Sequence, residues 1–202
     1  MSRLPLILGA ASIAAVLGVT LSLTYGRGQD LADCFGTAVA GADIGGPFTL
    51  VDPTGATVTD TDVITEPSLI YFGYGFCPDV CPIDNARNVA AVDLLQERGI
   101  EATPIFISID PERDTPEFMG DYAANMHPDM IGLTGSPEQV REAADAYRVI
   151  YSRNGDDPDY YLMNHSAFTY LMMPETGYAT FFRRDTTPEE VAEQTACAVN
   201  TI

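Results

Sequence analysis

A short, continuous apolar run in the first half of the chain predicts a buried strand. Residues 69–72, LIYF, are apolar throughout and contain the β-branched and aromatic side chains that strands favour. Gly73 and Gly75 follow, and glycine allows the chain to turn sharply where the strand ends. The pattern therefore places Cys77 and Cys81, which come next, at the end of a core strand.

A helix is predicted directly after the two cysteines. Pro82 lacks a backbone N–H and fits the first turn of a helix, which we place over residues 83–98, with Gly99 ending it. Cys81 then lies at the helix N-terminus, where free N–H groups and the helix dipole favour an anion. We therefore expect the Cys81 thiol to ionise more readily than that of an ordinary cysteine.

The remaining pattern predicts an α/β domain with a central mixed sheet. Three later helices are expected to begin at Thr115, Ser136 and Thr187, since each is followed by proline and glutamate, which gives an N-cap, a first-turn proline and an acid. The order hairpin, β, α, β, α, β, α, hairpin, α indicates a sheet with helices on both faces and an antiparallel edge. The other predicted elements are an N-terminal β-hairpin at 48–59, strands at 102–109, 130–133, 148–152, 166–172 and 178–182, and a loop at 154–159.

The N-terminal segment predicts a membrane anchor. Residues 4–25 carry no charge and number 22, enough to span a bilayer. Arg3 precedes them and the acidic bulk follows, so the positive-inside rule places the N-terminus in the cytoplasm and the rest across the inner membrane, in the periplasm or the equivalent intermembrane space. The predicted parts are an uncleaved anchor at 1–27, a tether with little regular structure at 28–46 and one folded domain at 47–202. A cleaved signal peptide is the alternative.

The charge balance excludes strongly anionic partners. The chain contains 29 acidic residues against 10 arginines, and it has no lysine. A domain this acidic does not attract nucleic acid or anionic lipid. The same charge serves solubility, or it serves to gather cations or a basic partner, and composition does not distinguish these uses.

The two cysteines allow three chemistries in an oxidising compartment: a structural disulfide, a redox-active dithiol or a soft-metal site. A disulfide between Cys77 and Cys81 would close so short a loop that it would stabilise the fold little. Of the two histidines, His127 is expected at the end of the helix that starts at Thr115, where the dipole stabilises it. His165 lies where a polar loop enters an apolar strand, a position that suits a hydrogen-bonded structural histidine as well as a metal ligand. Its pairing with two activated thiols makes it the candidate nitrogen ligand. Two thiolates and one imidazole form a low-coordinate soft site, which suits Cu(I).

Three motifs resemble those of the Sco/SenC family of membrane-anchored copper proteins. They are FCPDVCP at 76–82, SIDPERDTPE at 108–117 and NHSAFTYLM at 164–172, and the resemblance covers roughly residues 44–199. It implies a thioredoxin-like fold. It also implies that the loop 110–114 lies near the site, where we interpret Arg113 and Asp114 as an ion-pair and capping arrangement.

The resemblance further implies that Cys77, Cys81 and His165 bind copper, as Cu(I) with Cu(II) left open. The implied function is that of a metallochaperone that helps to mature the dinuclear copper centre of cytochrome c oxidase. Its implied partners are the copper-accepting subunit of the oxidase and other periplasmic copper or thiol-redox proteins. An enzyme is the alternative: a thiol-disulfide reductase that acts on the cysteines of the oxidase subunit through Cys77 and Cys81. Many family members have aspartate before the histidine, where this chain has Asn164.

Two further cysteines remain. Cys34 lies in the predicted tether and Cys197 in the last predicted helix. In an oxidising compartment they are expected either to form a disulfide that ties these segments together, or to leave Cys197 as a buried helix residue.

Overall fold

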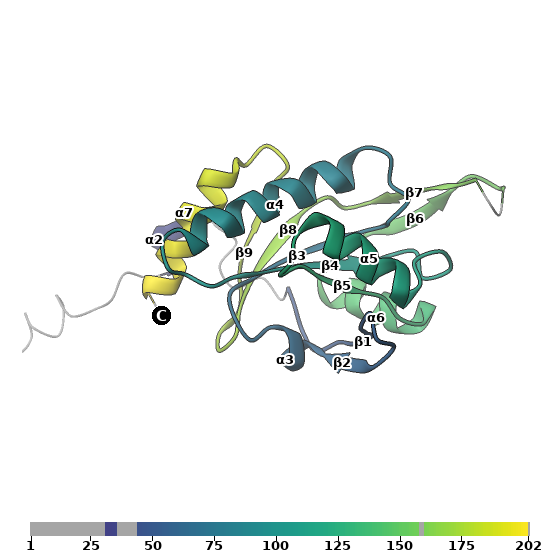
Figure 1. Ribbon diagram of the computed structural model, residues 1–202, viewed down its shortest axis with the longest axis horizontal. Helices are drawn as coiled ribbons and strands as arrows, with labels where there is room; N and C mark the ends of the chain where they lie inside the picture. Colours follow the sequence, from purple (N-terminus) through teal and green to yellow (C-terminus); the bar gives the residue numbers. More distant parts are fainter. Residues whose placement is uncertain (1–30, 36–43, 158–159, 202) are drawn as a thin grey trace, which may run out of the picture.

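A five-stranded mixed sheet forms the centre of the computed structural model, which describes residues 31–35, 44–157 and 160–201 (Figure 1). Its strands are β3 (Ser68–Gly73), β4 (Thr103–Ser108), β5 (Ile131–Leu133), β8 (Thr169–Met173) and β9 (Gly177–Phe182). Their order is β5-β4-β3-β8-β9, in which β3, β4 and β5 run parallel and β8 and β9 add antiparallel strands. The predicted mixed sheet with an antiparallel edge is confirmed.

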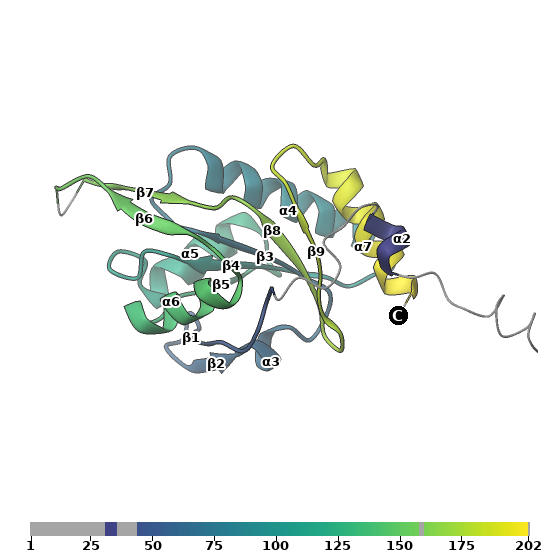
Figure 2. The ribbon, with the colours of Figure 1, turned by 180° about the vertical axis from the view of Figure 1, so that it is seen from behind.

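Helices cover both faces of this sheet (Figures 1 and 2). They are α4 (Val80–Gln96), α5 (Pro116–Met126), α6 (Pro137–Ala146) and α7 (Pro188–Thr201). One face of β3 and β4 carries Tyr71 and Phe106, and Phe106 packs against Tyr122 of α5. The opposite face carries Phe72, which packs against Tyr147 at the end of α6. Apolar packing on both faces explains why all six residues of β3 are buried.

The three predicted helix starts are confirmed. Thr115 caps α5 through its hydroxyl. Ser136 and Gln139 exchange side-chain and backbone hydrogen bonds at the start of α6, and Thr187 and Glu190 do the same at α7. Such capping boxes satisfy N–H groups that have no partner inside the helix.

The helix after the cysteines begins earlier than predicted. α4 starts at Val80 rather than at residue 83, so Pro82 occupies its third position. The first four N–H groups of a helix have no intrahelical partner, so the proline costs no hydrogen bond there. Cys81 therefore lies inside the first turn of α4, whereas Cys77 precedes the helix.

A third hairpin, which was not predicted from the sequence, carries His165. Strands β6 (Tyr151–Asn154) and β7 (Leu162–His165) pair antiparallel and form a separate two-stranded sheet. The hairpin projects from one end of the molecule (Figures 1 and 2). The predicted strand at 166–172 is wrong at its start, because β7 ends at His165 and β8 begins only at Thr169.

The predicted strand at 148–152 is also wrong at its start, because the chain is still ending α6 there. Arg148 has a φ of 56°, in the left-handed region that usually belongs to glycine. The N–H of Val149 donates to the carbonyl of Ala144, which closes the helix end. Extended structure begins only at Tyr151.

The segment before the main sheet adds small elements. Strands β1 (Thr49–Val51) and β2 (Thr57–Thr59) pair antiparallel, and a short helix α3 (Asp60–Val63), which was not predicted, follows them. Val51 forms an isolated bridge with Thr134, which attaches this pair beside the end of β5.

The predicted tether contains a short helix, α2 (Leu31–Phe35). The expectation of little regular structure is therefore wrong for these five residues. Cys34 of α2 and Cys197 of α7 form a disulfide, which confirms the first of the two interpretations of this pair. Within the described residues, no helix has the length and apolar character needed to cross a bilayer, and the predicted anchor at 4–25 lies outside them.

Candidate metal centre

Two thiols and one imidazole meet beyond the end of β3. The sulfur atoms of Cys77 and Cys81 and a ring nitrogen of His165 all lie within 4.8 Å of one another. The Cys81 Sγ is 3.4 Å from the His165 Nε2, although 84 positions separate the two residues in the chain. Both cysteines are free thiols. The fold thus brings together all three residues that the sequence analysis singled out.

The turn after β3 brings the thiols close to the sheet. A Cβ atom at Gly73 would lie 2.8 Å from the Cys81 Sγ, so only glycine leaves room for this sulfur. The N–H of Cys81 points at Cys77 and lies 3.4 Å from its Sγ. Cys81 is fully buried and Cys77 is partly exposed. One thiol is therefore accessible from solvent and the other is enclosed.

The expected easy ionisation of Cys81 is wrong. Burial raises the pKa of the Cys81 thiol, and a hydrogen bond with Cys77 raises it further. The helix N-terminus does favour a thiolate, but Cys81 is enclosed by the sheet and has lost the water that would stabilise its charge. A cation bound to the sulfur would replace the proton and supply the missing stabilisation.

His165 is arranged as a neutral base with a free nitrogen. Burial lowers the pKa of its ring, which favours the uncharged form. The Nδ1–H donates to the carbonyl of Ser166 at 3.0 Å, so the lone pair resides on Nε2, the atom that faces Cys81. The rings of Tyr71 and Tyr74 meet the imidazole edge-on, at centroid distances of 6.1 and 6.0 Å. The ring orientation is thereby fixed before any ligand arrives.

The neighbouring Asn164 does not contact the imidazole. Successive side chains of a strand point to opposite sides, and the Asn164 amide donates to the Ser152 hydroxyl of β6 at 3.4 Å. Asn164 is exposed, so its side chain is available to a partner.

His127 is the C-cap of α5 and pairs with Asp93 at 3.2 Å, which agrees with the helix-end position predicted for it.

The polar residues Asp84 and Arg184 near the site were not predicted from the sequence. Asp84 of α4 is buried and accepts a hydrogen bond from the Tyr71 hydroxyl at 3.0 Å, while Arg184 lies 3.4 Å from it. Asp84 raises the pKa of His165 and Arg184 lowers it, so the two partly cancel. The only signal for Asp84 in the sequence was its position as an acidic residue within the predicted helix 83–98, one face of which should be buried.

The ion-pair interpretation of the loop 110–114 is correct for Arg113, whose Nε lies 2.6 Å from a carboxylate oxygen of Asp110. Asp114 instead supports the thiol turn. Its Oδ2 accepts hydrogen bonds from the Ser108 hydroxyl at 2.6 Å and from the N–H of Gly75 at 3.0 Å. Burial raises the pKa of Asp114 to about 6, and these hydrogen bonds oppose the rise.

Asp114 is expected to make stability depend on pH. Because the folded state holds its proton more tightly than the unfolded chain, the contribution of Asp114 is full below the unfolded pKa, near 4, and is lost as pH rises through about 6. Relative to Asp114→Asn, the wild-type free energy of unfolding should fall by about 2 to 3 kcal/mol between pH 4 and pH 7. Urea unfolding of both proteins at several pH values measures this difference. A difference that stays constant over the range would contradict the assignment.

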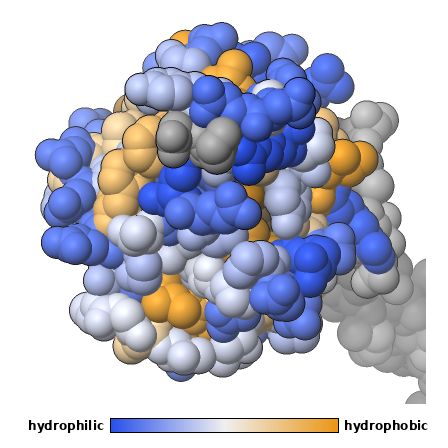
Figure 3. Space-filling model, turned by 90° about the vertical axis from the view of Figure 1, so that its right-hand side faces the viewer, coloured by the Kyte–Doolittle hydropathy of each residue, from blue (hydrophilic) through white to orange (hydrophobic). Residues whose placement is uncertain are grey.

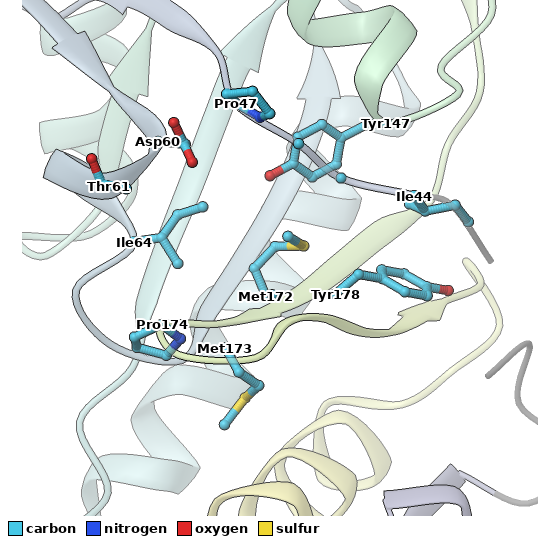
Figure 4. A pocket seen from close by; sticks show the side chains of 13 residues that line it. Ile44, Pro47, Asp60, Thr61, Ile64, Tyr147, Met172, Met173, Pro174 and Tyr178 are labelled. Carbon is cyan, nitrogen blue, oxygen red and sulfur yellow. The ribbon is translucent and has the colours of Figure 1, made fainter. Parts of the chain in front are cut away.

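A separate cavity lies at the other end of β3 (Figure 4). It has a volume of about 280 Å³, and Tyr147 and Met172 contribute to its walls. Met172 pairs with Ser68 at the start of β3, whereas the thiols follow the end of this strand. None of the three candidate ligands lines the cavity, so it is not part of the metal centre.

The chain is similar in sequence to a known protein family. The sequence model of the family described as SCO1/SenC matches residues 37–200. Protein SenC of Rhodobacter capsulatus is 50% identical over 205 residues, which cover 100% of this chain and 92% of that protein.

Two solved structures with copper bound have similar folds. The crystal structure of Arabidopsis thaliana ScoI with copper bound has a TM-score of 0.74 and 36% identity, covering 78% of this chain and 99% of that one. Bradyrhizobium japonicum ScoI with copper bound has a TM-score of 0.69 and 36% identity, covering 79% and 99%.

Proposed function

Because this chain belongs to the SCO1/SenC family, we propose that it is a copper-binding assembly factor that helps to mature the dinuclear copper centre of cytochrome c oxidase. One observation carries the proposal: the two sulfur atoms and the imidazole nitrogen converge within 4.8 Å. Thiolate sulfur and imidazole nitrogen are ligands that copper prefers. The copper bound in the similar Arabidopsis and Bradyrhizobium structures supports the same assignment.

In this proposal Cys77, Cys81 and His165 hold the copper ion as cargo. Both thiols give up their protons to the solvent on binding, and the neutral imidazole offers Nε2 without losing one. A site with three ligands and two thiolates suits Cu(I), because Zn(II) would require a fourth ligand. The described residues place no other cysteine, histidine or acidic side chain in this group.

Exposed apolar side chains beside the ligands support docking of a copper-accepting subunit. Phe76 precedes Cys77 and is 50% exposed, and Ile83 follows Cys81 and is 58% exposed. Phe168, close after the third ligand, is 36% exposed. At this end of the molecule, apolar patches interrupt a largely hydrophilic surface (Figure 3). A partner that covers them would exclude water while copper is transferred.

The proposed location is the periplasmic side of the inner membrane, or the equivalent intermembrane space, with residues 4–25 as an uncleaved single-pass anchor. The disulfide between Cys34 and Cys197 supports an oxidising compartment, because such bonds are rare where thiols are kept reduced. The anchor would keep the copper site close to a membrane-embedded oxidase.

The variant His165→Ala tests the proposal. It should bind Cu(I) about 100-fold more weakly than the wild type, the upper end of what residues that only orient a ligand typically cost, since two thiolates alone still form a two-coordinate site. The affinity is measured on the reduced full-length protein by competition with a Cu(I) chelator. His127→Ala is the matched control and should bind as the wild type does. Wild-type affinity in His165→Ala would refute the role of this histidine as a ligand.

The difference in exposure between the two thiols favours a second candidate function, that of a thiol-disulfide reductase. Cys77, partly exposed, would attack a partner disulfide, form a mixed disulfide and release one partner thiol; Cys81 would then attack the Cys77 sulfur and release the second. The chain would end oxidised and would need an external thiol reductant. Under this function, His165→Ala should leave the rate of disulfide reduction nearly unchanged.

A further inference from the structure

We propose that Arg113 sets the copper affinity of the site by holding the β6–β7 hairpin, and with it His165, against the thiol turn. The inference rests on the proposed function, and it adds a positioning residue that touches no ligand atom.

The hairpin shares no strand pairing with the main sheet. β6 and β7 pair only with each other, and His165 is the last residue of β7. The position of the imidazole relative to the thiols therefore depends on how the hairpin packs, both against the core through Tyr151 and Met163 and against the loop 110–114. A contact that holds the hairpin in place therefore contributes to the separation between Nε2 and the two sulfur atoms.

Arg113, Asp110 and Tyr161 form a closed ring of contacts that fixes the start of β7. The guanidinium of Arg113 donates from Nε to Asp110 at 2.6 Å and from Nη1 to the carbonyl of Tyr161 at 3.1 Å. The Tyr161 hydroxyl donates to the other oxygen of Asp110 at 2.6 Å. Asp110 and Tyr161 are only 3% and 5% exposed, so water does not compete for these bonds.

The same guanidinium also reaches the thiol turn. Its central carbon lies 3.6 Å from the centroid of the Tyr161 ring and 5.1 Å from that of Phe76, the residue before Cys77. It lies 5.8 Å from the ring of Tyr74, which itself meets the His165 ring edge-on. Arg113 therefore contacts both segments that carry ligands.

Only a planar, always charged group can both donate the hydrogen bonds to Asp110 and Tyr161 and stack on the aromatic rings. A guanidinium forms hydrogen bonds in its plane while its faces stack on aromatic rings, whereas a lysine ammonium is a point charge that cannot stack. Residues that only orient a metal ligand typically change metal affinity by about 10- to 100-fold. We expect an effect of this size from Arg113.

The comparison of Arg113→Lys with Arg153→Lys tests the inference. Arg153 lies 3.8 Å from the centroid of the same Tyr161 ring and hydrogen-bonds to the carbonyl of Asp157 within the hairpin. It also forms an exposed ion pair with Glu112 at 3.7 Å, which a lysine at this position can still form. In the reduced full-length protein, Arg113→Lys should weaken Cu(I) binding by about 10- to 100-fold and Arg153→Lys should stay near the wild type. Equal affinities in the two variants would overturn the inference.

A double-mutant cycle with His165→Ala separates positioning from a general effect on folding. If Arg113 acts through the histidine, Arg113→Lys should weaken binding in the wild-type background and not in the His165→Ala background. An equal loss in both backgrounds would overturn the inference, since Arg113 would then act on the thiols or on the whole fold. Tyr161→Phe, which removes one hydroxyl from the ring of contacts, should give a smaller loss of the same kind.

A measurement that needs no copper distinguishes failure of this inference from failure of the proposed function. Amide hydrogen exchange at 162–165 should be faster in Arg113→Lys than in Arg153→Lys, while exchange in β3 stays unchanged. Unchanged exchange at 162–165 would overturn the inference. If His165→Ala bound copper as the wild type does, the ligand assignment would fail, and the exchange result would still decide whether Arg113 holds the hairpin.

Discussion

The Cys81→Ser variant is expected to lose more than about 100-fold in Cu(I) affinity, beyond the range typical of residues that only orient a ligand. Serine is close in size, so it fits the space beside Gly73 where the sulfur lies. A serine hydroxyl does not ionise at neutral pH and is a hard donor, so Cu(I) would lose one of its two thiolates. The loss should exceed that of His165→Ala, after which two thiolates remain.

Chelator competition on the reduced full-length protein measures this loss, and the other cysteine pair provides the matched control. Cys34 and Cys197 lie in α2 and α7 and are absent from the group of candidate ligands. The double variant Cys34→Ser/Cys197→Ser should bind Cu(I) as the wild type does. An affinity of Cys81→Ser within about threefold of the wild type, less than 1 kcal/mol, would exclude this sulfur as a ligand.

The sequence predicted the thiol half of the site well because its signals are local. An apolar strand, two glycines and a proline in the first helical turn place Cys77 and Cys81 at a strand-to-helix junction, and the structure has that junction. The ionisation of Cys81 was predicted wrongly. Its pKa depends on burial by segments distant in sequence, which a pattern around residue 81 does not contain.

His165 was predicted as a ligand from its residue type and not from the element that carries it. His165 was singled out because the chain has only two histidines, but the hairpin that carries it was missed. The polar residues at 154–159 favour a loop, and the strands on either side are only four residues long. Arg113 was interpreted as half of an ion pair, which is correct, but its contacts with Tyr161 and Phe76 join segments that only the tertiary fold brings together.

The short helix α2 was also missed because it depends on contacts that only the tertiary fold provides. Five residues are too few to form a stable helix by themselves, so local propensity gave no reason to predict one. α2 is held against α7 by the disulfide between Cys34 and Cys197, and its Leu31 and Phe35 pack against the core beside α7. The tertiary contact therefore accounts for the helix.

The double variant Cys34→Ser/Cys197→Ser is expected to lose about 4 to 5 kcal/mol of stability. The bridge joins residues 163 positions apart, so it restricts most of the unfolded chain, and the chain-entropy model gives about that value for so long a loop. Without the bridge, the unfolded ensemble expands and exposes more surface. The dependence of the free energy of unfolding on urea should therefore steepen while the midpoint falls.

Urea unfolding of the full-length protein, followed by circular dichroism, measures both quantities at a pH where Asp114 is ionised. Serine at both positions avoids a lone reactive thiol, and the Cu(I) affinity of the same variant shows whether the metal centre stays intact. A loss below about 1 kcal/mol would mean that α2 opens independently of the domain, because a bridge to a segment already free in the folded state restricts little. A loss of several kcal/mol with unchanged copper affinity would separate the roles of the two cysteine pairs: one stabilises the fold, and the other binds the metal.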